Sequence, residues 1–312
     1  FMDIGKEAWD HRYNIGYWLW ELEEFPEEWM GNFHLVDEIW TPSEFISRTL
    51  RKYTDKPVNT IPYAVKAPTD ERYDRKHFGL PEDQFLYLMM FDGGSRAERK
   101  NPDAVIEAFK QAYAGRENCG EGDAQSTAES REARQVGLVV KINEPEQSEK
   151  DIAYIREVLR GYDNIYFICE TLGKTEVNSL IRCVDVFVSL HRAEGFGLVL
   201  AEAMLVGTPT IATSWSANTE FMNEDVACMV DADMIEITKD LPPFKKGYHW
   251  ADANIEQAAA YMRKLYEDTA YYERIQRGAH DYITDKLSLK RSSALMKQRI
   301  REIYDSNGES RE

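Results

Sequence analysis

Residues 185–213 read DVFVSLHRAEGFGLVLAEAMLVGTPTIAT and contain the pattern that decides the fold. The apolar run at the start is typical of a buried strand, and the loop after it holds Glu194 and a Gly-Phe-Gly turn. A helix is predicted from Leu198, closed by Gly207, and a second apolar run follows it. The stretch therefore predicts one strand–helix–strand unit of a parallel sheet.

From about residue 85 the chain alternates short apolar runs with longer amphipathic runs. One helix is predicted with Asn101 at its N-cap and Pro102 at its first position, another begins at Lys174, and the region from Asn254 onward is predicted to be helical. The apolar runs predict about six strands, which include residues from Phe85, Gly137, Asn164, Asp185, Thr208 and Val226 onward. We therefore predict an α/β fold, with a doubly wound parallel sheet covered by helices on both faces.

Two domains are predicted, and the first is incomplete. Residues 1–66 hold a Trp-rich stretch, a strand-to-helix step capped at Ser43 and a short strand. These are few strands for an independent α/β domain. We expect them to be part of a second, Rossmann-like domain, whereas residues 67–312 form the doubly wound domain. The last helix is a candidate for packing back on the first domain, and the polar run from Ala114 is predicted to be a surface loop.

The composition is that of a globular protein with a strong acidic balance. The formal net charge is -17 at pH 7 and no basic run compensates it, so nucleic acid is not an expected partner. The four cysteines, Cys119, Cys169, Cys183 and Cys228, show no metal-ligand spacing. Three of them lie in or beside apolar runs, which suits buried free thiols in a reducing compartment. No apolar run approaches the ~20 residues that cross a membrane. We expect a cytoplasmic protein without a transmembrane segment, and peripheral contact with the inner membrane face stays open.

The loop and helix start at residues 194–198 follow a strand, and open α/β sheets bind ligands at the carboxyl ends of their strands. Glycines let the backbone approach a ligand closely, and the free N–H groups in the first turn of a helix suit a phosphate. Glu202, about one turn into the helix, is placed to accept hydrogen bonds from vicinal ribose hydroxyls. The arrangement predicts a diphosphate site, with Glu194 facing what lies beyond the phosphates.

The segment HRAEGFGLVLAEAMLVGTPTIAT resembles the E-x7-E segment of retaining glycosyltransferases of family 4, in the glycosyl transferases group 1, which have the GT-B fold. SRAERKNPDAVIEAFKQAY is similar to the basic segment after the first strand of the family's donor domain. VDEIWTPSEF and NTIPYAV look like the end of its acceptor domain and the crossing to the donor domain. The first half of such an acceptor domain, with its Gly-rich loop, has no counterpart before Phe1. We therefore expect a fragment, or a chain that another chain completes.

The resemblance implies a role for each matching residue. Glu202 would bind the ribose and Glu194 the donor sugar, while Lys100, with Arg99 or Arg96, would bind the diphosphate. Glu194, Lys100 and Arg99 are the catalytic candidates. The base is expected near 170–172. The further donor-binding candidates are Gly195, Phe196, Gly197, Leu198, Lys141, His191, Arg96, Thr171 and Leu172.

Several of these residues also admit a structural role. Lys141 lies in an apolar strand, where a charge needs a partner, and His191 at a strand end is as often structural as it is a ligand contact. The Trp-rich stretch WLWELEEF, from Trp18, is interpreted as core rather than as a platform for a sugar. Asp231 and Asp233 form a D-x-D sequence in an architecture that does not use it for metal, so we expect no metal and no cofactor.

The sequence thus predicts the transfer of a hexose-like sugar from a nucleoside-diphosphate donor to a glycan or lipid-linked acceptor, with retention of configuration as the resemblance implies. A non-catalytic subunit that binds sugar nucleotides or glycans is the main alternative. A glycoside hydrolase would also use two carboxylates, but it needs no site for phosphates. A nicotinamide-dependent dehydrogenase is poorly supported, because no strand is followed by G-x-G-x-x-G.

Overall fold

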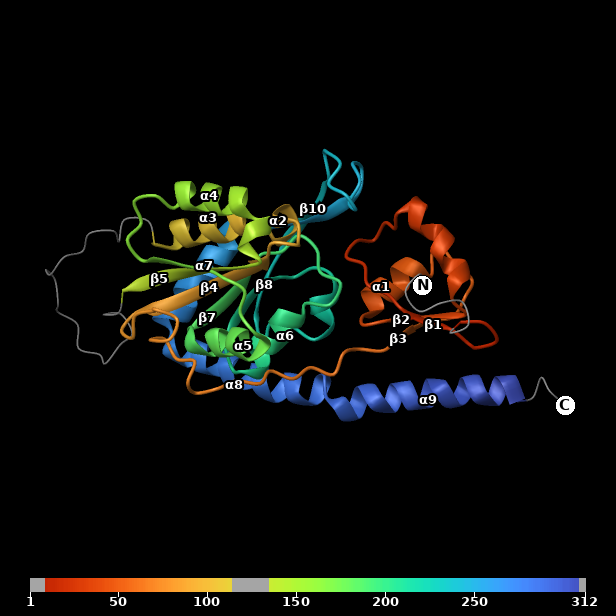
Figure 1. The fold of residues 1–312 in the computed structure, drawn as a ribbon. Helices are drawn as coiled ribbons and strands as arrows, with labels where there is room; N and C mark the ends of the chain where they lie inside the picture. The colour runs from red at the N-terminus through yellow and green to blue at the C-terminus, as the bar shows by residue number, and fades with distance from the viewer. Residues whose placement is uncertain (1–8, 114–134, 309–312) are drawn as a thin grey trace, which may run out of the picture.

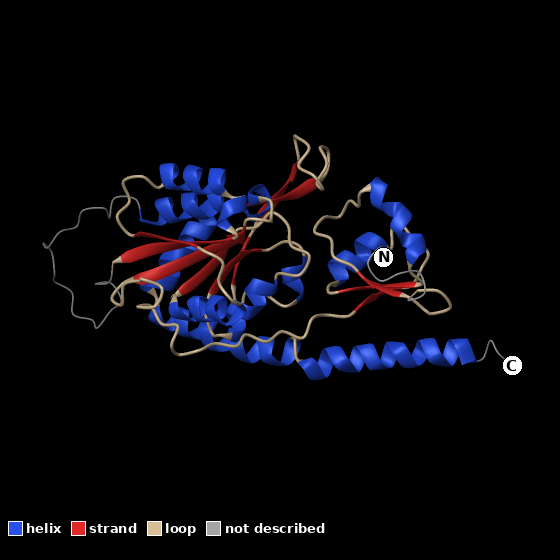
Figure 2. Ribbon diagram, viewed as in Figure 1, coloured by secondary structure: helices blue, strands red, loops and turns tan. Residues whose placement is uncertain are grey.

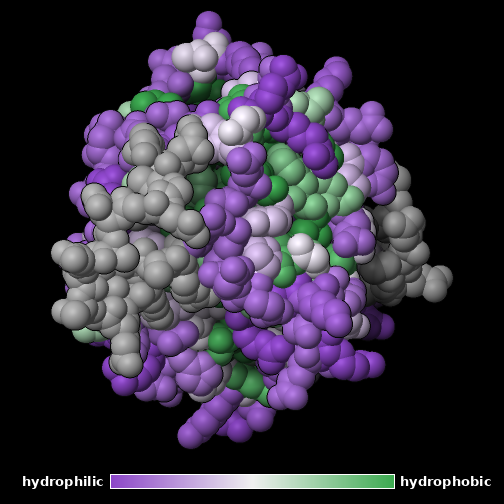
Figure 3. All heavy atoms as spheres, turned by 90° about the vertical axis from the view of Figure 1, so that its left-hand side faces the viewer, coloured by the Kyte–Doolittle hydropathy of each residue, from purple (hydrophilic) through white to green (hydrophobic). Residues whose placement is uncertain are grey.

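The computed structural model describes residues 9–113 and 135–308, so the loop predicted from Ala114, with Cys119, lies outside the described residues. The chain forms two parts, which lie beside one another in Figure 1. The larger part is built on a six-stranded sheet and the smaller part on a three-stranded sheet. The face on the left of Figure 1 is mostly hydrophilic, as the acidic composition leads us to expect, and its hydrophobic areas are small (Figure 3).

The six-stranded sheet contains the strands that the apolar runs predict, and every neighbouring pair in it is parallel. The strands are β4 (Phe85–Asp92), β5 (Val136–Asn143), β6 (Ile165–Cys169), β7 (Val186–Ser189), β8 (Thr210–Thr213) and β9 (Cys228–Val230). Their order in the sheet is β6-β5-β4-β7-β8-β9. The chain therefore builds outward from β4 and then returns to start β7 on the other side. In a doubly wound sheet, this switch point between β4 and β7 is where ligands bind.

Helices cover both faces of this sheet (Figures 1 and 2). The helices that pack on one face are α3 (Pro102–Tyr113), α4 (Glu149–Val158) and α7 (Ile255–Glu267). Those on the other face are α5 (Lys174–Cys183), α6 (Leu198–Leu205) and α8 (Thr269–Lys286). The small and apolar residues of α6 let it pack closely on the sheet, and Gly207, at a φ of 79°, turns the chain toward β8.

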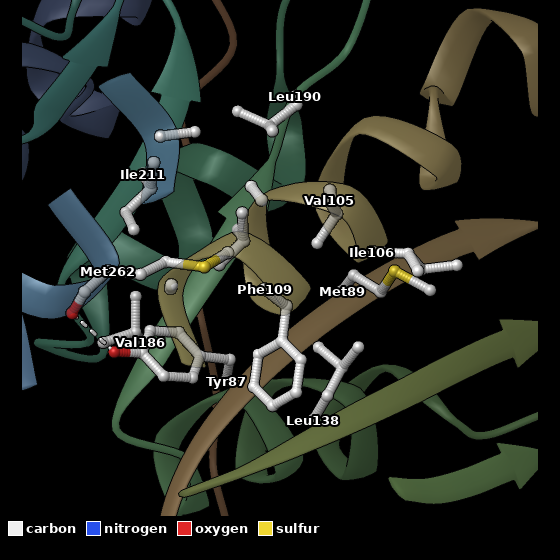
Figure 4. Packing of buried hydrophobic residues seen from close by; sticks show 14 of the residues in the cluster. Tyr87, Met89, Val105, Ile106, Phe109, Leu138, Val186, Leu190, Ile211 and Met262 are labelled. Carbon is white, nitrogen blue, oxygen red and sulfur yellow. Dashed lines mark hydrogen bonds between the residues drawn. The ribbon is translucent and has the colours of Figure 1, made fainter. Parts of the chain in front are cut away.

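The core between the sheet and α3 is close-packed (Figure 4). Tyr87 and Met89 of β4 and Leu138 of β5 meet Phe109 of α3, and the buried Tyr87 hydroxyl donates a hydrogen bond to the Met262 carbonyl at 2.7 Å. Burial of each such apolar side chain contributes about 1.5–3 kcal/mol. The sheet is consequently a firm base for the loops at the carboxyl ends of its strands.

The smaller part holds the N-terminal elements. Its strands pair in parallel in the order β1 (Ile15–Tyr17), β2 (Glu38–Thr41) and β3 (Val58–Thr60). The predicted strand-to-helix step is confirmed, since the Ser43 hydroxyl accepts a hydrogen bond from the Ile46 N–H at the start of α1 (Glu44–Leu50). A 3-10 helix, η2 (Glu27–Leu35), lies between β1 and β2.

The last helix, α9 (Leu289–Gly308), runs from the larger part alongside the smaller one (Figure 1). Its Arg299 forms an ion pair with Glu38 of β2, with 2.7 Å between Nη2 and Oε2. Glu38 is fully buried and also accepts hydrogen bonds from Trp40 and Tyr13. Burial opposes ionisation, but the Arg299 guanidinium and these donors lower the pKa of Glu38, so the ion pair joins the C-terminal helix to the N-terminal sheet.

Two local expectations need correction, and one element of the fold was not expected. Asn101 has a left-handed backbone, with a φ of 55°, and ends the short helix α2 (Ala97–Lys100), so it is not the extended N-cap that the sequence predicts for α3. Among the described cysteines Cys228 is buried, whereas Cys169 and Cys183 are only half-buried. The unexpected element is a two-stranded hairpin that no sequence pattern predicts, made of β10 (Ala232–Glu236) and β11 (His249–Ala253).

Candidate functional site

Two loops meet at the switch point of the large sheet. The first follows β4 and contains α2, with Arg99 and Lys100, and the second follows β7 and contains Glu194. The Arg99 carbonyl accepts a hydrogen bond from the Arg192 N–H at 2.8 Å, and the Arg99 guanidinium donates to the Ala193 carbonyl at 2.9 Å. One backbone hydrogen bond and one from the Arg99 side chain thereby join the basic segment to the loop of Glu194.

Glu194 is held by both cations of the first loop. Its Oε1 accepts a hydrogen bond from Arg99 Nη1 at 3.1 Å and forms an ion pair with Lys100. Only 13% of the Glu194 side chain is exposed. Burial opposes ionisation, but the charges of Lys100 and Arg99 lower the pKa of Glu194 to about 2, so the group is a carboxylate at neutral pH. The structure brings the three predicted catalytic residues together.

The Gly-Phe-Gly turn lies against the smaller part of the molecule. A Cβ on Gly195 would lie 2.8 Å from the Trp20 carbonyl oxygen, so a larger residue could not hold this position without a shift. The Gly195 carbonyl accepts a hydrogen bond from the Ser43 hydroxyl at 2.8 Å. Gly197 has a φ of 86° and leads directly into α6. The glycines thus allow a close approach of the backbone, although the neighbour in this structure is protein.

Glu202 lies inside α6 and is 1% exposed. One carboxylate oxygen, Oε1, forms an ion pair with Lys174 at the start of α5. The other, Oε2, is buried and has no hydrogen-bond partner among the described residues. Burial raises the pKa of Glu202, and Lys174 opposes this effect. A buried acceptor without a donor is costly, so a hydroxyl donor such as that of a ribose would satisfy Oε2 of Glu202.

The strand ends of β5 and β6 bring together Lys141, a candidate for phosphate binding, and residues 170–172, which are predicted to lie near the base. The Lys141 side chain is fully buried, and its ammonium donates to the Glu170 carbonyl at 2.6 Å and to Asn143 Oδ1 at 3.4 Å. Burial lowers the pKa of Lys141. Asn143 Oδ1 also accepts from the Leu172 N–H at 3.3 Å, while Thr171 is exposed and its hydroxyl accepts from a backbone N–H. Lys141 therefore organises this loop.

His191 is fully buried and bonded on both ring nitrogens. Nδ1 lies 3.2 Å from the Ser189 hydroxyl, and Nε2 lies 3.1 Å from Asn218 Oδ1 and 3.3 Å from the Trp215 carbonyl. Burial lowers the pKa of His191, so the imidazole is neutral at pH 7. In the described structure the ring positions the loop of Glu194, and its contact with a donor stays a prediction.

The remaining predicted residues are dispersed. Phe196 is buried, with its ring edge against Tyr63 and 5.0 Å between the ring centroids. Leu198 is 40% exposed at the first position of α6. Arg96 is exposed and donates to the Pro242 carbonyl at 3.0 Å, away from the ion pair of Glu194. The structure thus joins Arg99, not Arg96, to Glu194.

Two charged residues at the site are not among those predicted. Lys174 contacts Glu202, and it could have been suggested by its place at the start of a helix that follows a strand of the same sheet. Glu21 follows Trp20, and its carboxylate interacts electrostatically with the Arg99 side chain. Burial raises the pKa of Glu21. No local pattern marks Glu21, because its position depends on how the two parts of the molecule pack.

Neither a metal-binding cluster nor a membrane-spanning helix is present among the described residues. Within residues 9–113 and 135–308, no group of three or more His, Cys, Asp and Glu side chains is arranged to hold a metal ion. Asp231 of the D-x-D sequence is hydrogen-bonded to Gln257. The Asp231 N–H donates to Gln257 Oε1 at 2.6 Å, and Gln257 Nε2 donates to the Asp231 carboxylate at 3.2 Å. None of the described helices has the length and apolar character that crossing a bilayer requires. Independence from metals and cofactors stays a prediction.

This fold and these loops define a class of protein. The model of the family described as Glycosyl transferases group 1 matches residues 70–281, more than half of the chain, so the chain belongs to this family. It is similar to a curated relative, the lipopolysaccharide core biosynthesis mannosyltransferase LpsB of Rhizobium meliloti (strain 1021), with 35% identity over 81 residues. That match covers 25% of the chain and only 22% of the relative.

Solved structures are similar in fold. Anabaena Alr3699/HepE, in complex with UDP and glucose, has a TM-score of 0.65 and 16% identity, with 94% of this chain and 71% of that chain covered. Sucrose-phosphate synthase from Thermosynechococcus elongatus has a TM-score of 0.61 and 16% identity, with 87% of this chain and 59% of that chain covered. The predicted GT-B fold is confirmed by these neighbours.

Proposed function

We propose that this glycosyltransferase retains the configuration of the donor sugar and moves a hexose from a nucleoside-diphosphate donor to a glycan or lipid-linked acceptor. One observation carries the proposal. At the switch point of the sheet, Arg99 and Lys100 lie against Glu194, in the crevice where doubly wound sheets bind ligands. The unpartnered Oε2 of Glu202 supports a ribose contact on the neighbouring helix.

The charges suit the chemistry of donor cleavage. Breaking the bond between the anomeric carbon and the diphosphate leaves the bonding electron pair on the diphosphate oxygen. Lys100 and Arg99 would stabilise that growing negative charge, and this interaction strengthens toward the transition state. Glu194, already ionised, would bind the sugar next to the leaving group. These roles require neither a metal nor a covalent intermediate on the protein.

The relatives support the substrate class. LpsB is named a mannosyltransferase of lipopolysaccharide core biosynthesis, and the Anabaena protein is described with UDP and glucose. These descriptions favour a hexose, a nucleotide and a role in polysaccharide biosynthesis. The chain spans 22% of LpsB and 59% of the sucrose-phosphate synthase, so the activity of the whole protein is part of the proposal.

The test is turnover of a panel of nucleoside-diphosphate hexoses with glycan and lipid-linked acceptors, followed by NMR of the anomeric proton in the product. We expect release of the nucleoside diphosphate and a product with the anomeric configuration of the donor. An inverted product would contradict retention. Donor binding without transfer to any acceptor would favour the non-catalytic subunit.

A further inference from the structure

The carboxylate of Glu220 joins the larger part of the molecule to the start of α1, on the side of the smaller part that faces the larger one (Figure 1). Glu220 is the last residue of the 3-10 helix η5 (Ala217–Glu220), which follows β8. Its Oε2 accepts a hydrogen bond from the Glu44 N–H at 3.0 Å, and its Oε1 accepts one from the Phe45 N–H at 2.8 Å. The first N–H groups of a helix have no partner within it, and the charge of a carboxylate strengthens hydrogen bonds from them. One side chain of the larger part therefore satisfies two main-chain donors of the smaller part.

The opposite end of η5 holds the main chain of Glu194. The Glu194 N–H donates a hydrogen bond to the Ser216 hydroxyl at 3.0 Å, and the Glu194 carbonyl accepts one from the Ala217 N–H at 3.3 Å. Ser216 has a φ of 72°, a conformation that is uncommon for a residue with a side chain and persists only where its surroundings fix it. Because both main-chain groups of Glu194 are bonded at the start of η5, a displacement of η5 moves Glu194 with it.

A second contact closes these bonds into one network, termed the interface network, among α1, η5 and the loop of Glu194. Ser43, the N-cap of α1, donates to the Gly195 carbonyl at 2.8 Å, and Gly195 directly follows Glu194. Ser43 is buried, and the Phe45 ring meets the Trp215 ring edge to face, with 5.9 Å between the centroids. The first turn of α1 thus reaches Glu194 by two routes, one through η5 and one through Gly195.

Glu202 is held independently of the interface network. It lies inside α6, and its Oε1 is paired with Lys174 at the start of α5. None of the hydrogen bonds that form the network involves Glu202 or Lys174. The buried side chains of Leu200 and Met204 fix α6 against the core on its face of the sheet. A change at Glu220 should therefore reach Glu194 and leave the ribose contact proposed for Glu202 in place.

The position of Glu194 matters for the proposed chemistry. Its carboxylate is bound by Arg99 and Lys100, and the proposed function places the donor sugar next to it. A misplacement of about 1 Å near the reacting groups can lower a rate about 100-fold. The two cations restrain the end of the Glu194 side chain, whereas the interface network restrains its main chain. Together they fix the residue from both ends.

We propose that Glu220 is a positioning residue for glycosyl transfer. Its carboxylate docks the start of α1 onto η5, and this contact sets the position of Glu194 beside the donor sugar. The inference rests on the proposed function and adds to it a residue that acts through Glu194. The contact between the two parts of the molecule is thereby a condition for donor cleavage, and not for nucleoside binding.

Amide hydrogen exchange at Glu194 tests the interface network without any substrate, by mass spectrometry of peptides that span residues 192–197. Glu220→Ala removes both bonds to α1, so exchange of this amide should be about tenfold faster or more, because one charge-assisted hydrogen bond contributes about that factor. Glu224→Ala, at an exposed glutamate in the next turn of the chain, is the matched control and should leave the exchange unchanged. Exchange at Glu194 that is as slow in Glu220→Ala as in the wild type overturns the proposal.

Turnover of a nucleoside-diphosphate hexose separates positioning from a merely structural role. Glu220→Ala should lower kcat for donor cleavage about tenfold or more and change the Kd for the nucleoside diphosphate less than about threefold, because residues without shared partners couple weakly. Glu220→Gln keeps the size of the side chain and one acceptor oxygen, so its kcat and its exchange rate should lie between those of the wild type and Glu220→Ala. It carries both tests if Glu220→Ala does not fold. An unchanged kcat, or equal losses in kcat and in diphosphate affinity, overturns the positioning role.

The proposed function and the role of Glu220 fail in different ways. If the wild type neither binds a nucleoside diphosphate nor cleaves a donor, the proposed function fails. If the wild type cleaves its donor and Glu220→Ala cleaves it equally fast, the positioning role of Glu220 alone is wrong.

Discussion

Glu194 precedes the Gly-Phe-Gly turn and Glu202 lies inside the helix that follows it, yet their surroundings are opposite. Glu194 lies between two cations, Arg99 and Lys100, and has a pKa of about 2. Glu202 has only Lys174, whose side chain is 50% exposed, and a second oxygen without a partner among the described residues. Burial raises its pKa.

The difference indicates that Glu194 and Glu202 have separate roles within one motif. A buried carboxylate whose charge is already compensated holds its geometry before any ligand arrives, as a group beside a reacting bond should. A buried carboxylate that lacks a donor gains most from a ligand that brings one. We therefore expect Glu194 to contribute to stability and chemistry, and Glu202 to contribute to affinity for the nucleoside.

The largest effect is expected for the stability of Glu194→Gln. Removing one partner of a buried ion pair leaves Arg99 and Lys100 uncompensated, so the free energy of unfolding should fall by about 3 kcal/mol. Glu202→Gln should change it by less than about 1 kcal/mol, because Lys174 is half exposed and returns to water. Urea denaturation measures both, with Glu107→Gln on the exposed face of α3 as the matched control. Equal losses of unfolding free energy in Glu194→Gln and Glu202→Gln would contradict these separate roles.

The next effect concerns Lys100→Ala. Loss of the ammonium should weaken the binding of a nucleoside diphosphate by about 2 kcal/mol, because charge-assisted hydrogen bonds to phosphate contribute about that amount. Binding of the nucleoside alone should change much less. Calorimetry with UDP and uridine, or with the corresponding pair for another base, checks this. An equal loss for nucleoside and diphosphate would argue against a diphosphate contact.

The contributions of the two glutamates to stability should change with pH in opposite directions. The folded pKa of Glu194 is below its ordinary 4.5, so its contribution is present above that pH and falls by about 1 kcal/mol between about pH 5 and pH 3.5. The folded pKa of Glu202 is raised, so its contribution is present below the ordinary pKa and is lost as pH rises. Denaturation curves at several pH values should show a reduced acid loss in Glu194→Gln. If Glu194→Gln loses as much stability at low pH as the wild type does, other groups cause that loss.

The smallest effect is expected for Lys174→Met. Its half-exposed ammonium lowers the pKa of Glu202, so its removal should raise that pKa further. The Kd for a nucleoside diphosphate at pH 8 should change by less than about threefold, since solvent screens the pair. Calorimetry between pH 5 and pH 8 should show that the pH at which the Kd changes is higher in Lys174→Met than in the wild type. A shift downward would contradict the assignment.

The sequence predicts the large sheet well because its strands are nearly continuous apolar runs. The sequence does not predict β1 or β10, for the opposite reason. β1 has three residues, and β10 has largely exposed side chains without alternation, so neither differs from a loop in local pattern. The prediction of an N-cap at Asn101 is wrong because this residue type suits both an N-cap and a left-handed turn.

The candidate site also has one part that the sequence predicts and one part that it does not. Arg99, Lys100 and Glu194 meet as predicted, because loops after neighbouring parallel strands share one edge of the sheet. The contact between Ser43 and Gly195 joins residues 152 positions apart. Glu21 belongs to this packing of the two parts, which no spacing within the chain encodes.

Calorimetry of a panel of nucleoside diphosphates against the wild type and Glu202→Gln tests the central claim most directly. We expect at least one diphosphate to bind the wild type, and its Kd to rise about tenfold or more in Glu202→Gln, because a hydrogen bond to a charged group contributes about 1.5 kcal/mol or more. Glu107→Gln should leave that Kd unchanged. If no diphosphate binds, or if Glu202→Gln binds it as tightly as the wild type, the donor site is not at the switch point described.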